Sequence, residues 1–259
     1  MATYLLKKSY LLKDLQEVRF KDLWNEHGIF TTMWLFGKPP KILFFNKHIE
    51  NLIHSLKKYG INKSFLKKNI LLVINKNLLK NITYNHLLRV AVNKKIISIS
   101  LRKRFTPKLD FNLELVNLKR EKPEYKNLKY KKILSYLLKI DNSKSDIGII
   151  NKNKILETGT ANLIFVKNKK IYTPKKNYYE GQTLKFFKKK FKNIIKKDIF
   201  INDLKNFDEI LLVGSGKGVA SVKTIKQARW KRKSLNEYRV FSKHYHSAIK
   251  NCKLYRFKK

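Results

Sequence analysis

The amino-acid sequence predicts a two-lobed α+β protein, with a small N-terminal α/β lobe and a larger C-terminal α+β lobe. Segments that alternate polar and apolar residues, as strands do, are interleaved with segments whose apolar residues recur at helical spacing. A chain of 259 residues is long enough for two domains. Residues 106–125 carry Pro107, Pro123 and mixed charges, which is typical of a connection between lobes. We therefore predict an N-terminal lobe over 1–108, a linker over 109–122 and a C-terminal lobe over 123–259.

The N-terminal lobe is expected to combine strands with two helices. The apolar segment 29–36 precedes a Gly-Lys-Pro-Pro turn at 37–40, which indicates a strand that ends in a tight turn. The segment 48–61 has apolar residues three and four apart, so we predict an amphipathic helix there. A second helix is predicted over 64–79, and the alternating segment 89–105 is typical of paired strands.

The C-terminal lobe is expected to mix short strands with helices. Helical periodicity predicts helices over 130–140 and 184–195, and a last helix near the C-terminus that covers the core. A strand is expected to begin near Asp208 and to run into a glycine-rich turn. Further short apolar runs separated by polar turns predict strands over 146–151, 154–158, 162–166 and 169–173.

Composition excludes several classes of protein. Hydrophobic residues make up 43% and aromatic residues 12% of the chain, which excludes an intrinsically disordered protein. No apolar run approaches the length of a membrane helix, and Lys7 and Lys8 interrupt the opening residues before a signal-peptide core develops. The single cysteine, Cys252, cannot form an internal disulfide or a multi-thiolate metal site, and we expect a reducing cytoplasm. The six histidines lack ligand spacing apart from the pair His244 and His246, which we interpret as a surface feature, so no metal site is predicted.

The net charge of +42, from 60 basic and 18 acidic side chains, is that of many nucleic-acid-binding proteins. Only nine of the basic residues are arginine, however, and the lysines are spread along the whole chain. Surfaces that read bases favour the two-pronged guanidinium of arginine. We therefore attribute the charge to lysine-rich solvated faces and do not expect nucleic acid as a partner, although the charge would attract an anionic substrate.

Three segments in the second half of the chain carry features of an anion-binding site. Glu157 ends one predicted strand and Asn162 begins the next across a turn of small residues. Thr173-Pro174 follows a strand, and Gly181-Gln182-Thr183 begins a helix, where free backbone amides can bind a phosphate. The turn Gly214-Ser215-Gly216 allows amides to approach an anion closely. The spacing of these glycines is neither that of a P-loop nor that of a dinucleotide-binding motif.

These segments, taken in order, resemble the class IV aminotransferase family of fold-type IV pyridoxal-phosphate enzymes. The resemblance runs from about Gly28 to Trp230 and implies a C-terminal lobe that is barrel-like. It implies pyridoxal 5'-phosphate as cofactor, with Glu157 against the pyridine nitrogen. Through the same resemblance, Gln182, Thr183, Ser215 and Gly216 would bind the phosphate.

The resemblance also implies a Schiff-base lysine upstream of Glu157. Lys126 matches that position, and Asp146 begins a strand where the family has an Asp-led strand. Other lysines stand close to Lys126 and are alternatives: Lys129, Lys131 and Lys132. Two positions depart from the family pattern, because Asn51 replaces the arginine that clamps the phosphate and Lys129 replaces an asparagine. The family also implies a homodimer.

Within this family, the segment Gly28-Ile29-Phe30-Thr31-Thr32 is similar to that of 4-amino-4-deoxychorismate lyases. We therefore expect a lyase of folate biosynthesis that acts on a small anionic amine, with Thr31, Arg89 and Arg102 as candidate substrate-binding residues. The first alternative is an amino-acid transaminase for branched-chain or D-amino acids. The second alternative, of a different class, is a basic nucleic-acid-associated protein that has lost its cofactor.

Overall fold

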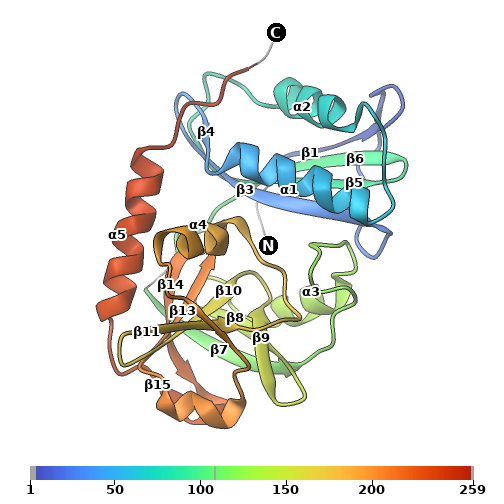
Figure 1. Cartoon of the computed structure of the whole chain (residues 1–259). Helices are drawn as coiled ribbons and strands as arrows, with labels where there is room; N and C mark the ends of the chain where they lie inside the picture. Colours follow the sequence, from blue (N-terminus) through green and yellow to red (C-terminus); the bar gives the residue numbers. More distant parts are fainter. Residues whose placement is uncertain (1–3, 108, 258–259) are drawn as a thin grey trace. The chain divides into compact units, whose positions relative to one another are not determined.

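The computed structural model describes residues 4–107 and 109–257 (Figure 1). The described chain forms two compact units. Unit 1 contains residues 4–104, 125–131 and 251–257, and unit 2 contains the remaining described residues, 105–107, 109–124 and 132–250.

Unit 1 is built on an antiparallel sheet of six strands. The strands are β1 (Tyr4–Leu11), β2 (Glu17–Val18), β3 (Gly28–Gly37), β4 (Lys41–Ile42), β5 (Tyr84–Asn93) and β6 (Ile96–Lys103). They lie in the order β2-β1-β6-β5-β3-β4. The long pair of β3 and β5 runs in continuous register from Gly28 opposite Asn93 to Gly37 opposite Tyr84. The sheet therefore holds residues of the 28–37 segment rigidly in place.

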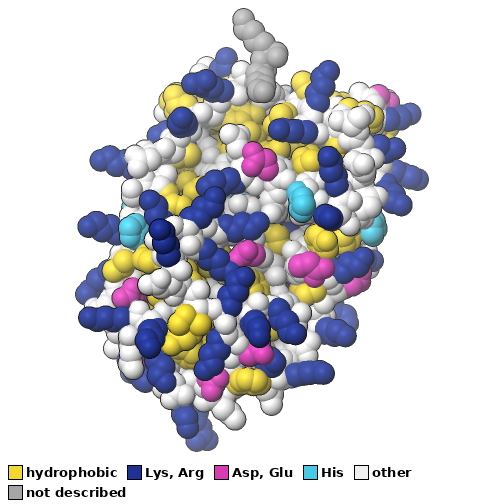
Figure 2. Space-filling view, in the orientation of Figure 1, with side chains coloured by type: hydrophobic (Ala, Val, Ile, Leu, Met, Phe, Trp, Pro, Cys, Tyr) yellow, Lys and Arg dark blue, Asp and Glu magenta, His cyan; other side chains and the backbone are white. Residues whose placement is uncertain are grey.

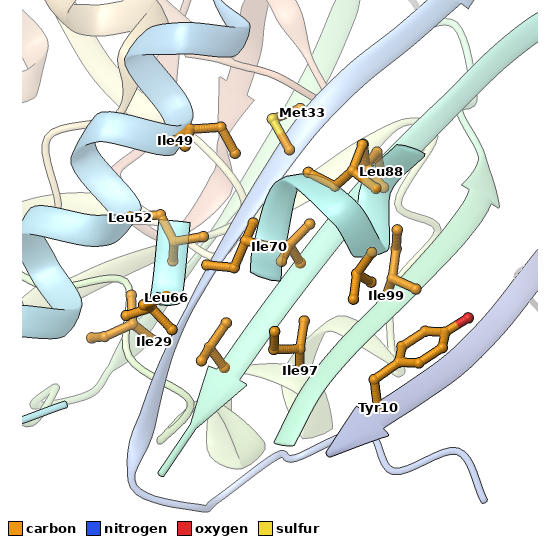
Figure 3. Close-up of a cluster of buried hydrophobic side chains, with 14 of the residues drawn as sticks. Tyr10, Ile29, Met33, Ile49, Leu52, Leu66, Ile70, Leu88, Ile97 and Ile99 are labelled. Atoms are coloured by element: carbon orange, nitrogen blue, oxygen red, sulfur yellow. The ribbon is translucent and has the colours of Figure 1, made fainter. Parts of the chain in front are cut away.

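Two helices, α1 (Phe45–Lys58) and α2 (Leu66–Asn77), cover one face of this sheet. The apolar residues of the two helices pack against alternate residues of the strands. Together these side chains form the hydrophobic core of unit 1. Figure 3 shows Met33, Leu88 and Ile97 from the strands beside Ile49 and Ile70 from the helices. Because side chains alternate along a strand, the residues between these core positions face the other side of the sheet.

Unit 2 contains a nine-stranded mixed sheet. Its strands are β7 (Asp110–Asn117), β8 (Ser145–Asn151), β9 (Lys154–Thr158), β10 (Asn162–Lys167), β11 (Lys170–Pro174), β12 (Ile195–Lys197), β13 (Glu209–Gly214), β14 (Gly218–Ile225) and β15 (Trp230–Lys231). The order is β12-β11-β10-β13-β14-β7-β8-β9, with β15 beside β14. The last strand of this order, β9, also contacts β10 and β11, so the sheet curls back on itself as a barrel does.

Unit 2 also contains the helices α3 (Lys131–Leu137), α4 (Gln182–Lys190) and α5 (Asn236–Lys250). Two short 3-10 helices, η1 (Ile201–Asn206) and η2 (Lys226–Ala228), are also present. The helices α4 and α5 pack against β13, and α5 also packs against β14. The Glu209 carboxylate accepts hydrogen bonds from the backbone amides of Glu237 and Tyr238, at 2.9 and 2.8 Å. It thereby caps the first turn of α5.

The predicted α+β class and the barrel-like C-terminal half are confirmed, while three local expectations are corrected. The range 109–122, predicted to be a linker, contains β7, because Phe111 and Leu113 are buried between exposed Asn112 and Glu114. Residues 125–131, predicted to lie in the C-terminal lobe, pack in unit 1. The helix predicted over 184–195 ends at Lys190, after which the backbone becomes extended.

Candidate active site

The segment that carries Lys126 lies along β3 in unit 1. The Phe30 amide donates to the Lys126 carbonyl at 2.9 Å, and the Leu128 amide donates to the Gly28 carbonyl at 2.9 Å. A Cβ at Gly28 would lie 2.6 Å from Leu128 Cδ1 and 2.3 Å from the Val92 carbonyl oxygen. Glycine at this position therefore allows the segment to approach the sheet, and Lys126 is held on a rigid element.

Burial separates Lys126 from the alternative lysines. Lys126 is partly buried, and its ammonium nitrogen lies 5.0 Å from the centre of the Phe30 ring. Lys129, Lys131 and Lys132 are exposed, and Lys129 donates to the Asn25 carbonyl at 2.9 Å. An amine that must bind a cofactor in a shielded site fits Lys126 better than these solvated positions.

Arginine side chains lie on the same face of the sheet as Phe30. The Arg89 guanidinium carbon lies 3.7 Å from the Trp24 ring centre and 5.3 Å from the Phe30 ring centre. Burial lowers the pKa of Arg89 to about 10, and burial also lowers the pKa of Arg102, while Tyr4 and Tyr130 oppose the latter effect. Among the residues that the structure describes, Arg89 Nε has no hydrogen-bond partner. This face therefore presents cationic groups around the ring that Lys126 contacts.

Thr31 and Asn51 belong to the helix-covered side of unit 1. Thr31 is 3% exposed, and its hydroxyl shares a 2.8 Å hydrogen bond with His48 Nδ1 on α1. Asn51 lies one helical turn after His48 and is partly buried. The side chain of Thr31 thus ties β3 to α1, whereas Phe30 and Arg89 face the opposite side of the sheet.

Glu157, on β9 of unit 2, is held by partners that come from different parts of the chain. Its Oε1 accepts a hydrogen bond from Arg120 Nη1, and its Oε2 accepts one from the Tyr179 amide at 3.3 Å. The side chains of Arg120 and Glu157 are only 6% and 7% exposed. The carboxylate is therefore buried, charge-paired and fixed in orientation.

The turn that follows Glu157 is organised by Asp146 on β8. Asp146 is fully buried and accepts hydrogen bonds from the hydroxyls of Thr158 and Thr160, at 3.0 and 2.5 Å. Burial raises the pKa of Asp146, and Lys217 and these hydroxyls oppose that rise. The Thr158 hydroxyl also accepts a hydrogen bond from the Ala161 amide at 2.8 Å. Asp146 thus shapes the connection between Glu157 and β10.

Asn162, the first residue of β10, connects this turn to the start of α4. Its Oδ1 accepts from the Gly181 amide at 2.9 Å, and its Nδ2 donates to the Tyr179 carbonyl at 2.6 Å. A Cβ at Gly181 would lie 2.9 Å from Asn162 Oδ1, so this approach requires glycine. The amides of Gln182 and Thr183 form the first turn of α4, where backbone N–H groups point away from the helix.

Thr183 adds an unsatisfied donor to this helix start. It is 1% exposed, and its hydroxyl has no hydrogen-bond partner among residues 4–107 and 109–257. A buried hydroxyl without a partner costs free energy, and at a helix start, beside free backbone amides, an anionic ligand oxygen would satisfy it. The start of α4 therefore fits a phosphate group.

The second glycine-rich turn begins at the same end of the sheet. Asn162 pairs with Val213, the residue before Gly214, so the turn with Ser215 and Gly216 begins one residue beyond. A Cβ at Gly214 would lie 3.3 Å from the Thr160 carbonyl oxygen. The structure thus brings together, within unit 2, the predicted residues Glu157, Gln182, Thr183, Ser215 and Gly216.

The chemical groups in this arrangement suit those of pyridoxal phosphate. The arrangement combines a buried carboxylate, which suits a protonated ring nitrogen, with backbone amides and an unsatisfied buried hydroxyl, which suit a phosphate. Lys126 and Arg89 belong to unit 1, where both contact the Phe30 ring, and Arg102 lies on β6 of the same unit.

Sequence reasoning missed Arg120, the partner of Glu157. It lies just after β7, in the range predicted to be a linker. Its residue type could have indicated a specific role, because arginine is scarce in this chain, with nine occurrences among 60 basic residues. Its pairing with a residue 37 positions away carries no local pattern.

Among the described residues, no group of three or more His, Cys, Asp or Glu side chains is arranged to hold a metal ion. Figure 2 shows Lys and Arg side chains spread over the whole visible face, without one gathered basic patch. Within the same described ranges, no helix combines the length and the apolar character needed to cross a membrane.

Comparisons with known proteins agree with this geometry. Residues 28–225 match the family model described as amino-transferase class IV. No curated protein matched the chain in sequence.

Solved structures with the same fold share little sequence with the chain. A branched-chain aminotransferase from Thermoproteus uzoniensis, solved with norvaline, has a TM-score of 0.77 and 14% identity, with 96% of each chain covered. A hypothetical aminotransferase from Mycobacterium tuberculosis in its PLP-bound form has a TM-score of 0.68 and 13% identity, over 94% of this chain and 99% of that one. A "Putative 4-amino-4-deoxychorismate lyase" from Legionella pneumophila has a TM-score of 0.67 and 17% identity, over 86% and 91%.

Proposed function

Because the chain belongs to the class IV aminotransferase family of pyridoxal-phosphate-dependent enzymes, we propose that it is a lyase that converts 4-amino-4-deoxychorismate to 4-aminobenzoate and pyruvate. The observation that carries this proposal is the cationic group around Phe30. The Lys126 ammonium and the Arg89 guanidinium both contact that ring, and Arg102 lies on the same sheet. A substrate with two carboxylates would neutralise these cations, whereas a branched-chain amino acid has one carboxylate and an apolar side chain.

Each group of the chain has a distinct part in this reaction. The cofactor, when bound, supplies a ring that withdraws electrons from the carbon next to the substrate amine. Gln182, Thr183, Ser215 and Gly216 would hold its phosphate. Glu157 would hold a proton at the ring nitrogen. The absence of an arginine at Asn51 removes one two-pronged phosphate contact, so we expect weaker cofactor binding than that clamp would provide.

Lys126 would act as the general base. Its amine would take the proton from the substrate carbon that bears the amine, and the electron pair released would form the aromatic ring as the carbon–oxygen bond to the enolpyruvyl group breaks. The enol that leaves takes up a proton and becomes pyruvate, so the reaction needs no oxidant and no second substrate. Arg89 and Arg102 would orient the substrate carboxylates.

The test supplies 4-amino-4-deoxychorismate to the cofactor-loaded protein without any keto acid. We expect pyruvate and 4-aminobenzoate in equal amounts, and we expect Lys126→Ala to abolish both products and the fixation of cofactor by borohydride. Lys129→Ala is the matched control, because that lysine is exposed and only three residues away. It should retain activity and fixation.

The same assay distinguishes the alternatives. Formation of a new amino acid from a keto acid, with no 4-aminobenzoate, would replace the lyase with a transaminase of the same family. A colourless protein that takes up no pyridoxal phosphate and binds DNA with steep salt dependence would favour the basic nucleic-acid-associated alternative.

Two further expectations accompany this function. We propose a homodimer, as implied by the resemblance to the family, and size-exclusion chromatography with light scattering would measure it. We also propose a cytoplasmic location, which the single thiol of Cys252 supports because it requires no oxidising compartment.

A further inference from the structure

The buried ion pair between Arg120 and Glu157 is not accounted for by the proposed roles. Arg120 Nη1 donates to Glu157 Oε1 and also lies 3.4 Å from the Pro123 carbonyl oxygen. Both charged side chains are more than nine-tenths buried. One guanidinium nitrogen, Nη1, is thus placed between a backbone carbonyl and the carboxylate.

A guanidinium in this position changes what Glu157 can do for a cofactor. Arginine keeps its charge at all relevant pH values, so the carboxylate is partly neutralised before any ligand arrives. A protonated ring nitrogen at the same carboxylate would add a second cation to a poorly solvated site. Two cations that share one carboxylate repel each other, and the nearby fixed charge disfavours the protonated ring.

We propose that Arg120 is a positioning residue that fixes the Glu157 carboxylate and limits how strongly that carboxylate protonates the cofactor ring. This inference rests on the proposed function, in which Glu157 faces the ring nitrogen. Arg120 itself takes no proton and touches no reacting atom. Its effect is exerted through the orientation and charge of Glu157.

The test compares Arg120→Gln with the wild-type protein in two readouts that do not depend on turnover. The first is the pH at which the ring nitrogen of the bound cofactor loses its proton, followed by absorbance. We expect this pH to rise by about one unit or more when the neighbouring cation is removed. The second is the stabilisation that saturating pyridoxal phosphate confers in urea unfolding. We expect a larger stabilisation in Arg120→Gln, because the protonated ring then compensates a carboxylate that has lost its guanidinium.

Arg232→Gln is the matched control. Arg232 forms a 2.8 Å ion pair with Asp110 in the same unit and is 13% exposed. Its removal should lower the stability of the cofactor-free protein but leave both cofactor readouts at their wild-type values. A merely structural role of Arg120 would give this same pattern.

The outcomes separate this inference from the proposed function. If Arg120→Gln binds the cofactor with unchanged titration and unchanged stabilisation, the inference is overturned while the proposed function stands. If Arg120→Gln does not fold, Arg120→Met takes its place, because methionine keeps much of the length of the side chain and removes the charge; the same rise is expected, and no shift overturns the inference. A wild-type protein that binds no pyridoxal phosphate would overturn the proposed function and this inference with it.

Discussion

At the scale of one residue, the buried hydroxyl of Thr183 supports a ligand site at the start of α4. This hydroxyl is buried at the first turn of α4 and has no hydrogen-bond partner among the described residues. We predict that Thr183→Val leaves the free energy of unfolding of the cofactor-free protein unchanged or raises it by about 1 kcal/mol, because valine removes an unsatisfied donor. The dissociation constant for pyridoxal phosphate should rise about tenfold, the equivalent of one lost hydrogen bond.

Urea unfolding and an absorbance titration with the cofactor measure these two effects. Thr173→Val is the control, since Thr173 on β11 also buries a hydroxyl without a hydrogen-bond partner in the part of the chain that the structure describes. Valine there should have the same effect on stability but leave cofactor affinity unchanged. Equal affinity of the wild-type protein and Thr183→Val would argue against a phosphate at the start of α4.

At the scale of the element, the pairing of β3 with the 125–131 segment decides where Lys126 lies. The approach depends on Gly28, where a Cβ would lie within 2.6 Å of Leu128. We predict that Gly28→Ala lowers the free energy of unfolding by about 1–3 kcal/mol, because an added methyl group in a packed contact forces the backbone apart. The same change should displace Lys126 and slow the fixation of cofactor by borohydride.

Hydrogen exchange gives a local readout of this displacement. The Leu128 amide, which donates to the Gly28 carbonyl at 2.9 Å, should exchange faster in Gly28→Ala. The Leu212 amide on β13 of unit 2 serves as an internal reference. Unchanged protection of Leu128 would contradict the role assigned to this contact.

At the scale of the whole molecule, the net charge of +42 acts against folding and in favour of anion binding. We predict that raising the salt concentration from about 20 mM to about 300 mM raises the melting temperature, because screening weakens the repulsion between lysines. A gain of about 1 kcal/mol would correspond to roughly 2–4 °C for a chain of this size. The KM for an anionic substrate should rise over the same range.

Differential scanning fluorimetry with two salts at equal ionic strength measures this effect. Sodium chloride and potassium acetate should give the same curve if screening is the cause, and different curves if one ion binds specifically. A melting temperature that does not change with ionic strength would contradict the prediction.

Much of the fold could be predicted from neighbouring residues. The apolar spacing of 48–61 predicted α1, and the alternation of 89–105 predicted the pair of β5 and β6, because both patterns reflect which side chains face a core. The strand β7 was missed because Pro107 and Pro123 dominate the pattern around it, although Phe111 and Leu113 are buried. The strand β1 was missed because lysines interrupt its apolar residues.

The amino-acid sequence by itself determined the class of the fold, the family and the residues that we propose for the cofactor, since these depend on residue types and their order along the chain. Only the tertiary structure decided that Arg120 forms an ion pair with Glu157 and that Asn162 connects two turns. It also decided that Lys126 and Arg89 both contact the Phe30 ring. Such contacts join residues that are far apart in the chain, and their free energy comes from burial and charge pairing, which no local spacing encodes.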